Sequence, residues 1–127
     1  MNRVVLDASA LLTLLHSEPG HEMVAGLIPH SIISTINVTE VITVLINRGM
    51  PAEKAVEAVS DVLNETLPFD LKQATEAACL ITETKKYGLS LGDRACLSLG
   101  KLKKLPVLTA DKIWNKLKVG VEIQLLR

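Results

Sequence analysis

Aromatic residues and cysteines are scarce in this sequence. Only 2% of its 127 residues are aromatic, and cysteine occurs twice. One tryptophan, Trp114, is more often part of a core than a platform for stacked bases, so recognition of nucleic acid by stacking has little support. Cys79 and Cys96 each lie among apolar neighbours, which predicts buried, reduced thiols rather than a disulfide. The three histidines are scattered, and no Cys/His spacing typical of a zinc site occurs.

Long apolar runs and targeting signals are also absent. No apolar run reaches the length of a membrane helix, and residues 1–7 are typical of a strand rather than of a signal peptide. Residues 88–92 lack the consecutive Lys-Ser/Thr pattern of a P-loop. The sequence therefore predicts a cytoplasmic protein without a membrane partner. With 48% hydrophobic and 22% charged residues, it is expected to form one compact domain over residues 1–127.

Net charge is zero, but the charges are unevenly distributed. Acidic residues outnumber basic ones up to Thr84, and basic residues outnumber acidic ones from Lys85 onward. The densest basic region consists of Lys101, Lys103, Lys104, Lys112, Lys116 and Lys118. Such a region can bind a polyanion such as RNA, or it can be a solvated lysine face. Charge alone favours the solvated face.

Predicted strands alternate with predicted helices through most of the chain. Short apolar, β-branched runs predict strands at 3–6, 31–35, 66–69, 106–109 and 121–126. Helical patterns are found at 8–16, 21–28, from Asn37 or Thr39 to 48, from 51 onward, from 71 to 88, within 90–102 and at 111–117. This alternation predicts an α/β fold, with a central, mostly parallel sheet and helices on both faces.

Four acidic residues occur where apolar sequence surrounds or precedes them. They are Asp7, Glu40, Asp93 and Asp111. A carboxylate in apolar surroundings is costly unless it is paired, hydrogen-bonded or bound to a cation. Asp7 and Asp111 follow predicted strands, and Glu40 is in the opening turn of the helix after the second strand. Because ligands bind at the carboxyl ends of strands in such sheets, these three are expected at one edge. Asp93 follows no strand directly and is placed less securely.

An acidic cluster without His or Cys suits a hard cation such as Mg²⁺ or Mn²⁺. Such ions promote the hydrolysis of phosphate esters. The alternative for each acid is a role at a helix N-terminus. Asp7 and Asp111 are candidate N-caps, and Ser90 with Asp93 fits a capping box. Glu40 is the hardest to explain in that way.

Polar neighbours of the acids are weaker candidates for substrate binding. Ser9 and Thr109 can hydrogen-bond a phosphate, a metal-bound water or a carboxylate, and Ser9 can equally cap a helix. Asn37 can orient Glu40 or cap its helix. Arg94 can bind phosphate or form a surface ion pair, and the ion pair is favoured.

Four segments together resemble a PIN domain, and the length and layout resemble the VapC-type toxins of toxin–antitoxin pairs. The segments are residues 4–10, 37–41, 87–96 and 108–114. Each is only moderately specific, whereas all four in this order are highly specific. The resemblance covers nearly the whole chain.

The resemblance implies a Mg²⁺- or Mn²⁺-dependent endoribonuclease that leaves 3′-hydroxyl and 5′-phosphate ends. Asp7 and Asp93 would be the principal metal ligands, and Glu40 and Asp111 would complete the site. It also implies a homodimer and a cognate antitoxin. Asn115 stands near a position where many PIN domains carry a further acid or Asn, which puts a second strong metal site in doubt.

Two other functions compete with this interpretation. A receiver-like, Mg²⁺-binding signalling domain also gathers acids at strand ends, but Asp7 has no acidic neighbour and the central Asp-bearing strand is missing. A non-catalytic RNA-binding domain would use the lysine-rich last third of the chain, but it leaves Glu40 unexplained.

Overall fold

The protein is built around a five-stranded parallel sheet. The computed structural model describes residues 2–127. Its strands lie in the order β3-β2-β1-β4-β5, and every neighbouring pair is parallel. Their bounds are β1 Val4–Leu6, β2 Ser31–Ser34, β3 Glu65–Leu67, β4 Val107–Thr109 and β5 Ile123–Leu125. The predicted α/β fold is confirmed.

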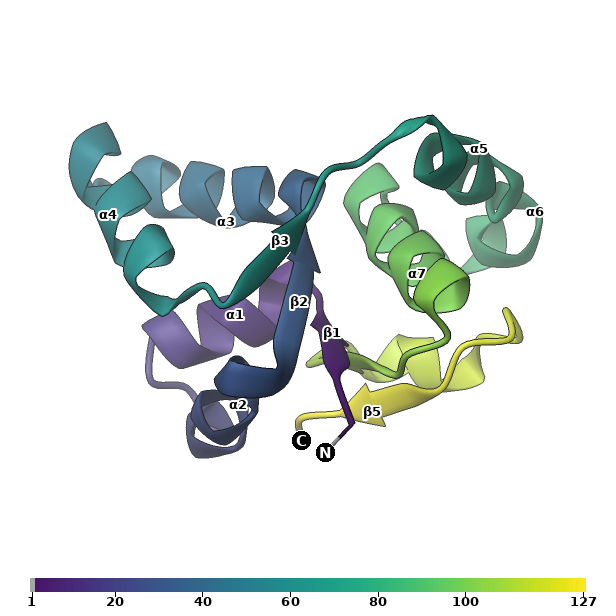
Figure 1. Ribbon diagram of the computed structural model, residues 1–127, viewed down its shortest axis with the longest axis horizontal. Helices are drawn as coiled ribbons and strands as arrows, with labels where there is room; N and C mark the ends of the chain where they lie inside the picture. The colour runs from purple at the N-terminus through teal and green to yellow at the C-terminus, as the bar shows by residue number, and fades with distance from the viewer. Residues whose placement is uncertain (1) are drawn as a thin grey trace.

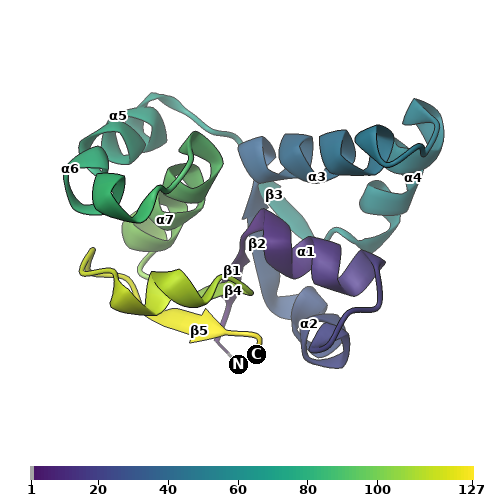
Figure 2. The same ribbon diagram turned by 180° about the vertical axis from the view of Figure 1, so that it is seen from behind.

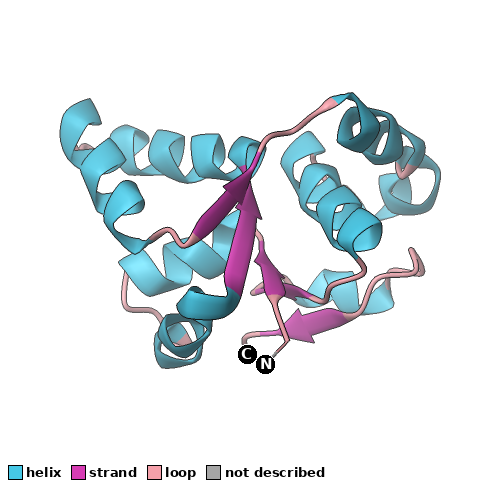
Figure 3. Cartoon of the chain, in the orientation of Figure 1, coloured by secondary structure: helices cyan, strands magenta, loops and turns pink. Residues whose placement is uncertain are grey.

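Helices cover both faces of this sheet (Figure 1, and Figure 2 from behind). One group contains α1 Ala8–Leu15, α2 His21–Leu27, α3 Thr35–Asn47 and α4 Ala52–Val62. The other contains α5 Leu71–Cys79, α6 Ile81–Thr84 and α7 Leu91–Lys103. Three short 3₁₀ helices complete the chain: η1 Ile28–His30, η2 Lys85–Tyr87 and η3 Lys112–Lys116. Figure 3 shows that helices fill most of the molecule around short strands.

Alternate strand residues point into two separate cores, as the twofold period of a strand requires. Leu6 of β1 packs with Leu11, Val41 and Leu108 on one face of the sheet. Val5, the preceding residue, belongs to the opposite core. That second core also contains Ile32, Leu97, Val107 and Trp114. Trp114 is fully buried, so the prediction that it serves packing is confirmed.

Two predictions about helix starts and burial are wrong. Helix α3 begins at Thr35 rather than at Asn37 or Thr39, because the Ser34 side chain caps it by accepting from the Ile36 N–H. Cys79 is exposed, although Cys96 is buried and both thiols are free. Apolar sequence neighbours did not place Cys79 on an inner face, because α5 buries Gln73 and Ala77 instead.

The long helix predicted for residues 71–88 is divided into α5, α6 and η2. Gly88 ends it as predicted, with a φ of 71°. Leu71, the first residue of α5, is 79% exposed. Within residues 2–127, no helix is both long and apolar enough to cross a membrane.

Candidate active site

Asp7 is a buried carboxylate at the carboxyl end of β1. It directly follows Leu6, and only 4% of it is exposed. Its Oδ1 accepts hydrogen bonds from the Ala10 N–H at 2.8 Å and from Ser9 Oγ at 2.7 Å. Its Oδ2 accepts from Thr109 Oγ1 at 2.5 Å. The N-cap role is therefore real, but it occupies only part of this carboxylate.

The hydrogen bonds to the Asp7 carboxylate do not fully offset the cost of burying its charge. Burial raises the pKa of Asp7 to about 6, and the nearby charge of Asp93 acts in the same direction. The hydrogen bonds from Thr109, Ser9 and Ala10 lower the pKa without offsetting burial. Ion pairs among residues 2–127 are Arg3–Glu65, His21–Glu22 and Lys101–Glu76. No basic side chain in the described chain thus neutralises Asp7.

Thr109 at the end of β4 and Ser9 in the first turn of α1 connect these two elements. Thr109 Oγ1, which donates to Asp7, accepts from the Asp111 N–H at 3.0 Å. Ser9 Oγ accepts from the Ala110 N–H at 2.9 Å. Both hydroxyls therefore orient the Asp7 carboxylate, so the structure assigns them a role within the acidic site. Their predicted contact with substrate stays a prediction.

Glu40 and Asp93 come from different helices. Glu40 lies in the second turn of α3, because that helix begins earlier than predicted. Burial raises the pKa of its half-buried carboxyl, the Asn37 hydrogen bond lowers it, and the Asp93 charge raises it. Asp93 is in the first turn of α7, and its Oδ2 accepts from the Ser90 N–H at 2.9 Å. The predicted capping box is confirmed, and it engages one oxygen of Asp93.

A buried thiol lies near three of the acids. Cys96 lies one turn after Asp93 in α7 and is fully buried. Burial raises the pKa of its thiol, and the charges of Asp7, Asp93 and Glu40 raise it further. The charges of all three carboxylates therefore reach one buried atom, which places them in the same part of the molecule. The spacing of three residues from Asp93 placed Cys96 on this side of α7, a signal that the sequence analysis did not use.

Asp111 lies at the margin of this cluster. It caps η3 by accepting from the Ile113 N–H at 3.1 Å, and it is exposed. Its charge is not among the causes that shift the pKa of Asp7 or Glu40. The hydrogen bond from its backbone to Thr109 is its connection to the buried carboxylate. The structure therefore brings together Asp7, Glu40 and Asp93 more closely than Asp111.

The oxygen ligands of this cluster suit a hard divalent cation. Asp7, Glu40 and Asp93 supply oxygens without nitrogen or sulfur competition from His, and two of them have raised pKa values. Among residues 2–127, however, no three His, Cys, Asp or Glu side chains are already arranged as a metal-binding group. An ion would have to draw these carboxylates together against their mutual repulsion, which its own positive charge would offset.

Arg94 does not form the predicted surface ion pair. Its Nη1 donates to the Ala77 carbonyl oxygen at 3.0 Å and thereby links α7 to α5. The reason is its position one residue after Asp93, which turns it toward α5 and away from the carboxylate cluster. The prediction that Arg94 binds substrate finds no support in this geometry.

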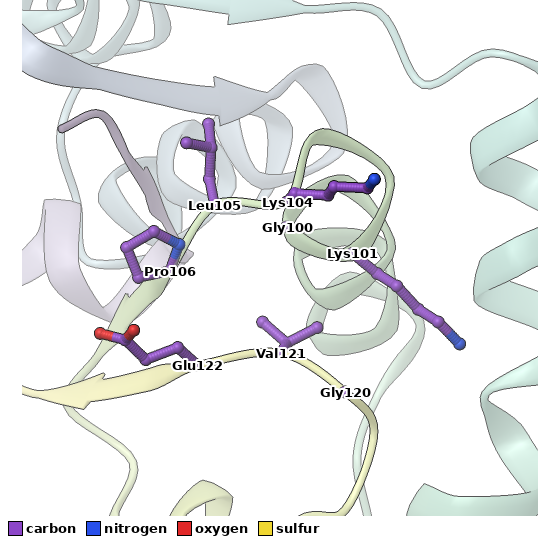
Figure 4. Close-up of a pocket in the computed structure, with 8 residues that line it drawn as sticks. All are labelled: Gly100, Lys101, Lys104, Leu105, Pro106, Gly120, Val121 and Glu122. Carbon is purple, nitrogen blue, oxygen red and sulfur yellow. The ribbon is translucent and has the colours of Figure 1, made fainter.

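The lysine-rich region is divided between opposite edges of the sheet. Lys101, Lys103 and Lys104 lie at the end of α7, before β4 begins, whereas Lys112 and Lys116 belong to η3, after β4 ends. A cavity of about 240 Å³ lies beside Lys101 and Lys104. Figure 4 shows the residues that line it. Pro106 and Glu122, which precede β4 and β5, also line it. This cavity is therefore at the amino ends of the strands, away from Asp7.

A family model, described as the PIN domain, matches residues 4–120 of the sequence. The chain belongs to the PIN domain family. This membership confirms the resemblance drawn from the four segments, and it agrees with the convergence of Asp7, Glu40 and Asp93 at one sheet edge. A search among curated proteins finds no match to the sequence.

Solved structures with this PIN fold include several toxin–antitoxin proteins. A DNA-bound VapBC from Salmonella typhimurium has a TM-score of 0.77 at 18% identity and covers 100% of both chains. A toxin–antitoxin complex from Klebsiella pneumoniae has a TM-score of 0.73 at 17% identity, covering 98% of each chain. VapC20 from Mycobacterium tuberculosis, described as a sarcin-ricin loop cleaving toxin, has a TM-score of 0.72 at 16% identity, covering 89% of this chain and 93% of that one.

The raised pKa of Asp7 predicts how the stability of the folded protein changes with pH. A carboxyl whose pKa is higher in the folded state than the ordinary 3.8 binds a proton on folding. The free energy of unfolding contributed by Asp7 therefore falls as pH rises from about 4 to about 6, by about 3 kcal/mol in the metal-free protein. We expect Asp7→Asn to be more stable than the parent at pH 7.5, and this advantage to shrink toward pH 4.5. Urea unfolding of both proteins at each pH measures it, and an equal or lower stability of Asp7→Asn at pH 7.5 would contradict it.

Proposed function

We propose that this PIN domain is a Mg²⁺- or Mn²⁺-dependent endoribonuclease that acts in the cytoplasm. The observation that carries the proposal is the convergence of Asp7, Glu40 and Asp93 without a basic partner in the described chain. Negative groups kept together in this way favour a divalent cation. When bound, such an ion polarises the phosphoryl oxygen and lowers the pKa of an attacking water.

In this proposal the side chains have distinct roles. Asp7, fixed by Ser9 and Thr109, and Asp93, whose Oδ2 is engaged by its capping box, are the principal ligands. Glu40 completes the site. Asp111 is exposed at the same edge, and we propose that it contributes through water. Lys112 and Lys116 follow it in η3 and are placed to attract the RNA backbone.

The neighbouring structures support a proposal for the substrate class and the partner. VapC20 of Mycobacterium tuberculosis is described as cleaving the sarcin-ricin loop, and the Klebsiella and Salmonella structures are toxin–antitoxin assemblies. We therefore propose RNA as the substrate class and a cognate antitoxin as the inhibitor. We also propose a homodimer as the active form, as the resemblance to VapC-type toxins implies. Membership of the PIN family disfavours a receiver-like signalling domain. The presence of all four acids disfavours a non-catalytic RNA-binding domain.

Cleavage of RNA tests the activity. The parent is expected to cut total RNA in Mn²⁺ or Mg²⁺, and EDTA is expected to abolish cutting. Asp93→Asn removes a proposed ligand while retaining the helix position, so we expect the rate to fall at least about 100-fold. Asp61→Asn, an exposed acid in α4, is the matched control and should cut as the parent does. An Asp93→Asn protein that folds and cuts at the parental rate would refute the assignment.

Thermal unfolding tests the metal separately from the reaction. A ligand that binds only the folded state raises Tm as its concentration increases. We expect Mn²⁺ to raise the Tm of the parent at pH 7.5, because the carboxylates are then ionised. Asp7→Asn should show little of this increase. If Mn²⁺ raises both Tm values equally, Asp7 is not a ligand.

A further inference from the structure

Gly92 lies directly beneath the carboxylate of Glu40. It is buried in the first turn of α7, immediately before Asp93. A Cβ atom added at Gly92 would lie 2.1 Å from Glu40 Oε2 and 2.3 Å from both Cδ and Oε1. Gly92 has no positive φ, so its backbone does not require glycine. The space that a side chain would need is occupied by the carboxylate itself.

Asn37 holds the same carboxylate in place. Its Nδ2 donates to Glu40 Oε1 at 2.7 Å and to the Gly92 carbonyl oxygen at 3.0 Å. One amide group therefore links α3, which carries Glu40, to the residue before Asp93 in α7. Helix capping does not explain Asn37, because Ser34 caps α3.

Fold stability alone is a poor explanation for Asn37. It is 1% exposed, and its Oδ1 has no hydrogen-bond partner in the described chain. A buried acceptor without a partner opposes folding and offsets part of what the two donated bonds contribute. The Asn37 amide instead fixes the position of Glu40 Oε1 relative to the Gly92 carbonyl oxygen.

We infer that Asn37 and Gly92 are positioning residues that set the location of Glu40 relative to Asp93. This inference rests on the proposed function, because the acids are taken as a metal site. Glu40, Asn37 and Gly92 form what we call the α3–α7 interlock. Because Gly92 is adjacent to Asp93, a change in the interlock alters the spacing between the two acids.

Gly92→Ala is the informative variant. Its methyl group and the Glu40 carboxylate cannot occupy the same space. The carboxylate is the end of a flexible side chain, so it should move while the backbone remains in place. Alanine also has a higher helix propensity than glycine, so the variant is expected to fold. Gly26→Ala is the matched control, since Gly26 is helical and no atom lies within 4 Å of the added Cβ.

A double-mutant cycle in metal-free protein tests the interlock. It compares the parent with Gly92→Ala, Glu40→Ala and the double variant. Removal of the Glu40 carboxylate frees the space above Gly92. We therefore expect the effect of Gly92→Ala on Tm to be more favourable in the Glu40→Ala background, by roughly 2–6 °C. Gly26→Ala should have the same effect in both backgrounds. Equal effects of Gly92→Ala in the two backgrounds would overturn the interlock.

Mn²⁺ titration, followed by Tm and by calorimetry, tests the positioning role without RNA. Gly92→Ala and Asn37→Ala should each weaken Mn²⁺ binding about 10–100-fold, as loss of groups that orient a ligand does. In the Glu40→Ala background, neither change should weaken binding further. If both single variants bind Mn²⁺ as the parent does, the positioning role is wrong.

Together, the metal-free double-mutant cycle and the Mn²⁺ titration distinguish failure of this inference from failure of the proposed function. A parent that binds no Mn²⁺ refutes the proposed metal site, and with it the role of the interlock in metal binding. A non-additive cycle in metal-free protein would still support the contact between Gly92 and Glu40. A parent that binds Mn²⁺, together with an additive cycle, refutes the interlock alone.

Discussion

Burial of carboxylates at one edge of the sheet, with repulsion from Asp93 added to it, is the constraint on which the site depends. Asp7 is almost completely buried, Glu40 is half-buried, and Asp93 raises the pKa of both. No ion pair in the described chain involves any of them. Each arrangement that brings these groups together disfavours their charged forms, and a divalent cation reverses that preference. The folded protein thus holds unfavourable electrostatic energy at the place where it is proposed to bind metal.

The rest of the fold keeps the carboxylates from moving apart. Parallel strands β1 and β4 place Asp7 beside Thr109, and the hydroxyl groups of Thr109 in β4 and Ser9 in α1 bind the same carboxylate. On the other side, Asn37 ties α3 to α7. Two apolar cores hold these elements on the sheet. Stability that Asp7 removes at neutral pH must therefore come from burial elsewhere, as is common at functional sites.

The sequence predicted the sheet and the acids because both have local signals. Apolar β-branched runs marked the strands, and isolated acids in apolar surroundings marked Asp7 and Glu40. Gly92 had no such signal, because its importance arises from a side chain fifty-two residues away that only packing brings near it. Cys79 was misplaced because apolar neighbours in sequence do not show which helix face is inner. Arg94 was misjudged because its partner is a backbone carbonyl on α5, which charge patterns do not reveal.

Titration of the Asp7 carboxyl is the most direct test of whether this buried carboxylate binds a divalent cation. NMR of ¹³C-labelled side chains can follow this group with and without Mg²⁺, which is diamagnetic. We expect the Asp7 carboxyl to have a pKa near 6 in metal-free protein. This pKa should fall markedly when Mg²⁺ is added, because bound cations favour the ionised carboxylate. A pKa near the ordinary value of 3.8, unchanged by Mg²⁺, would contradict this expectation.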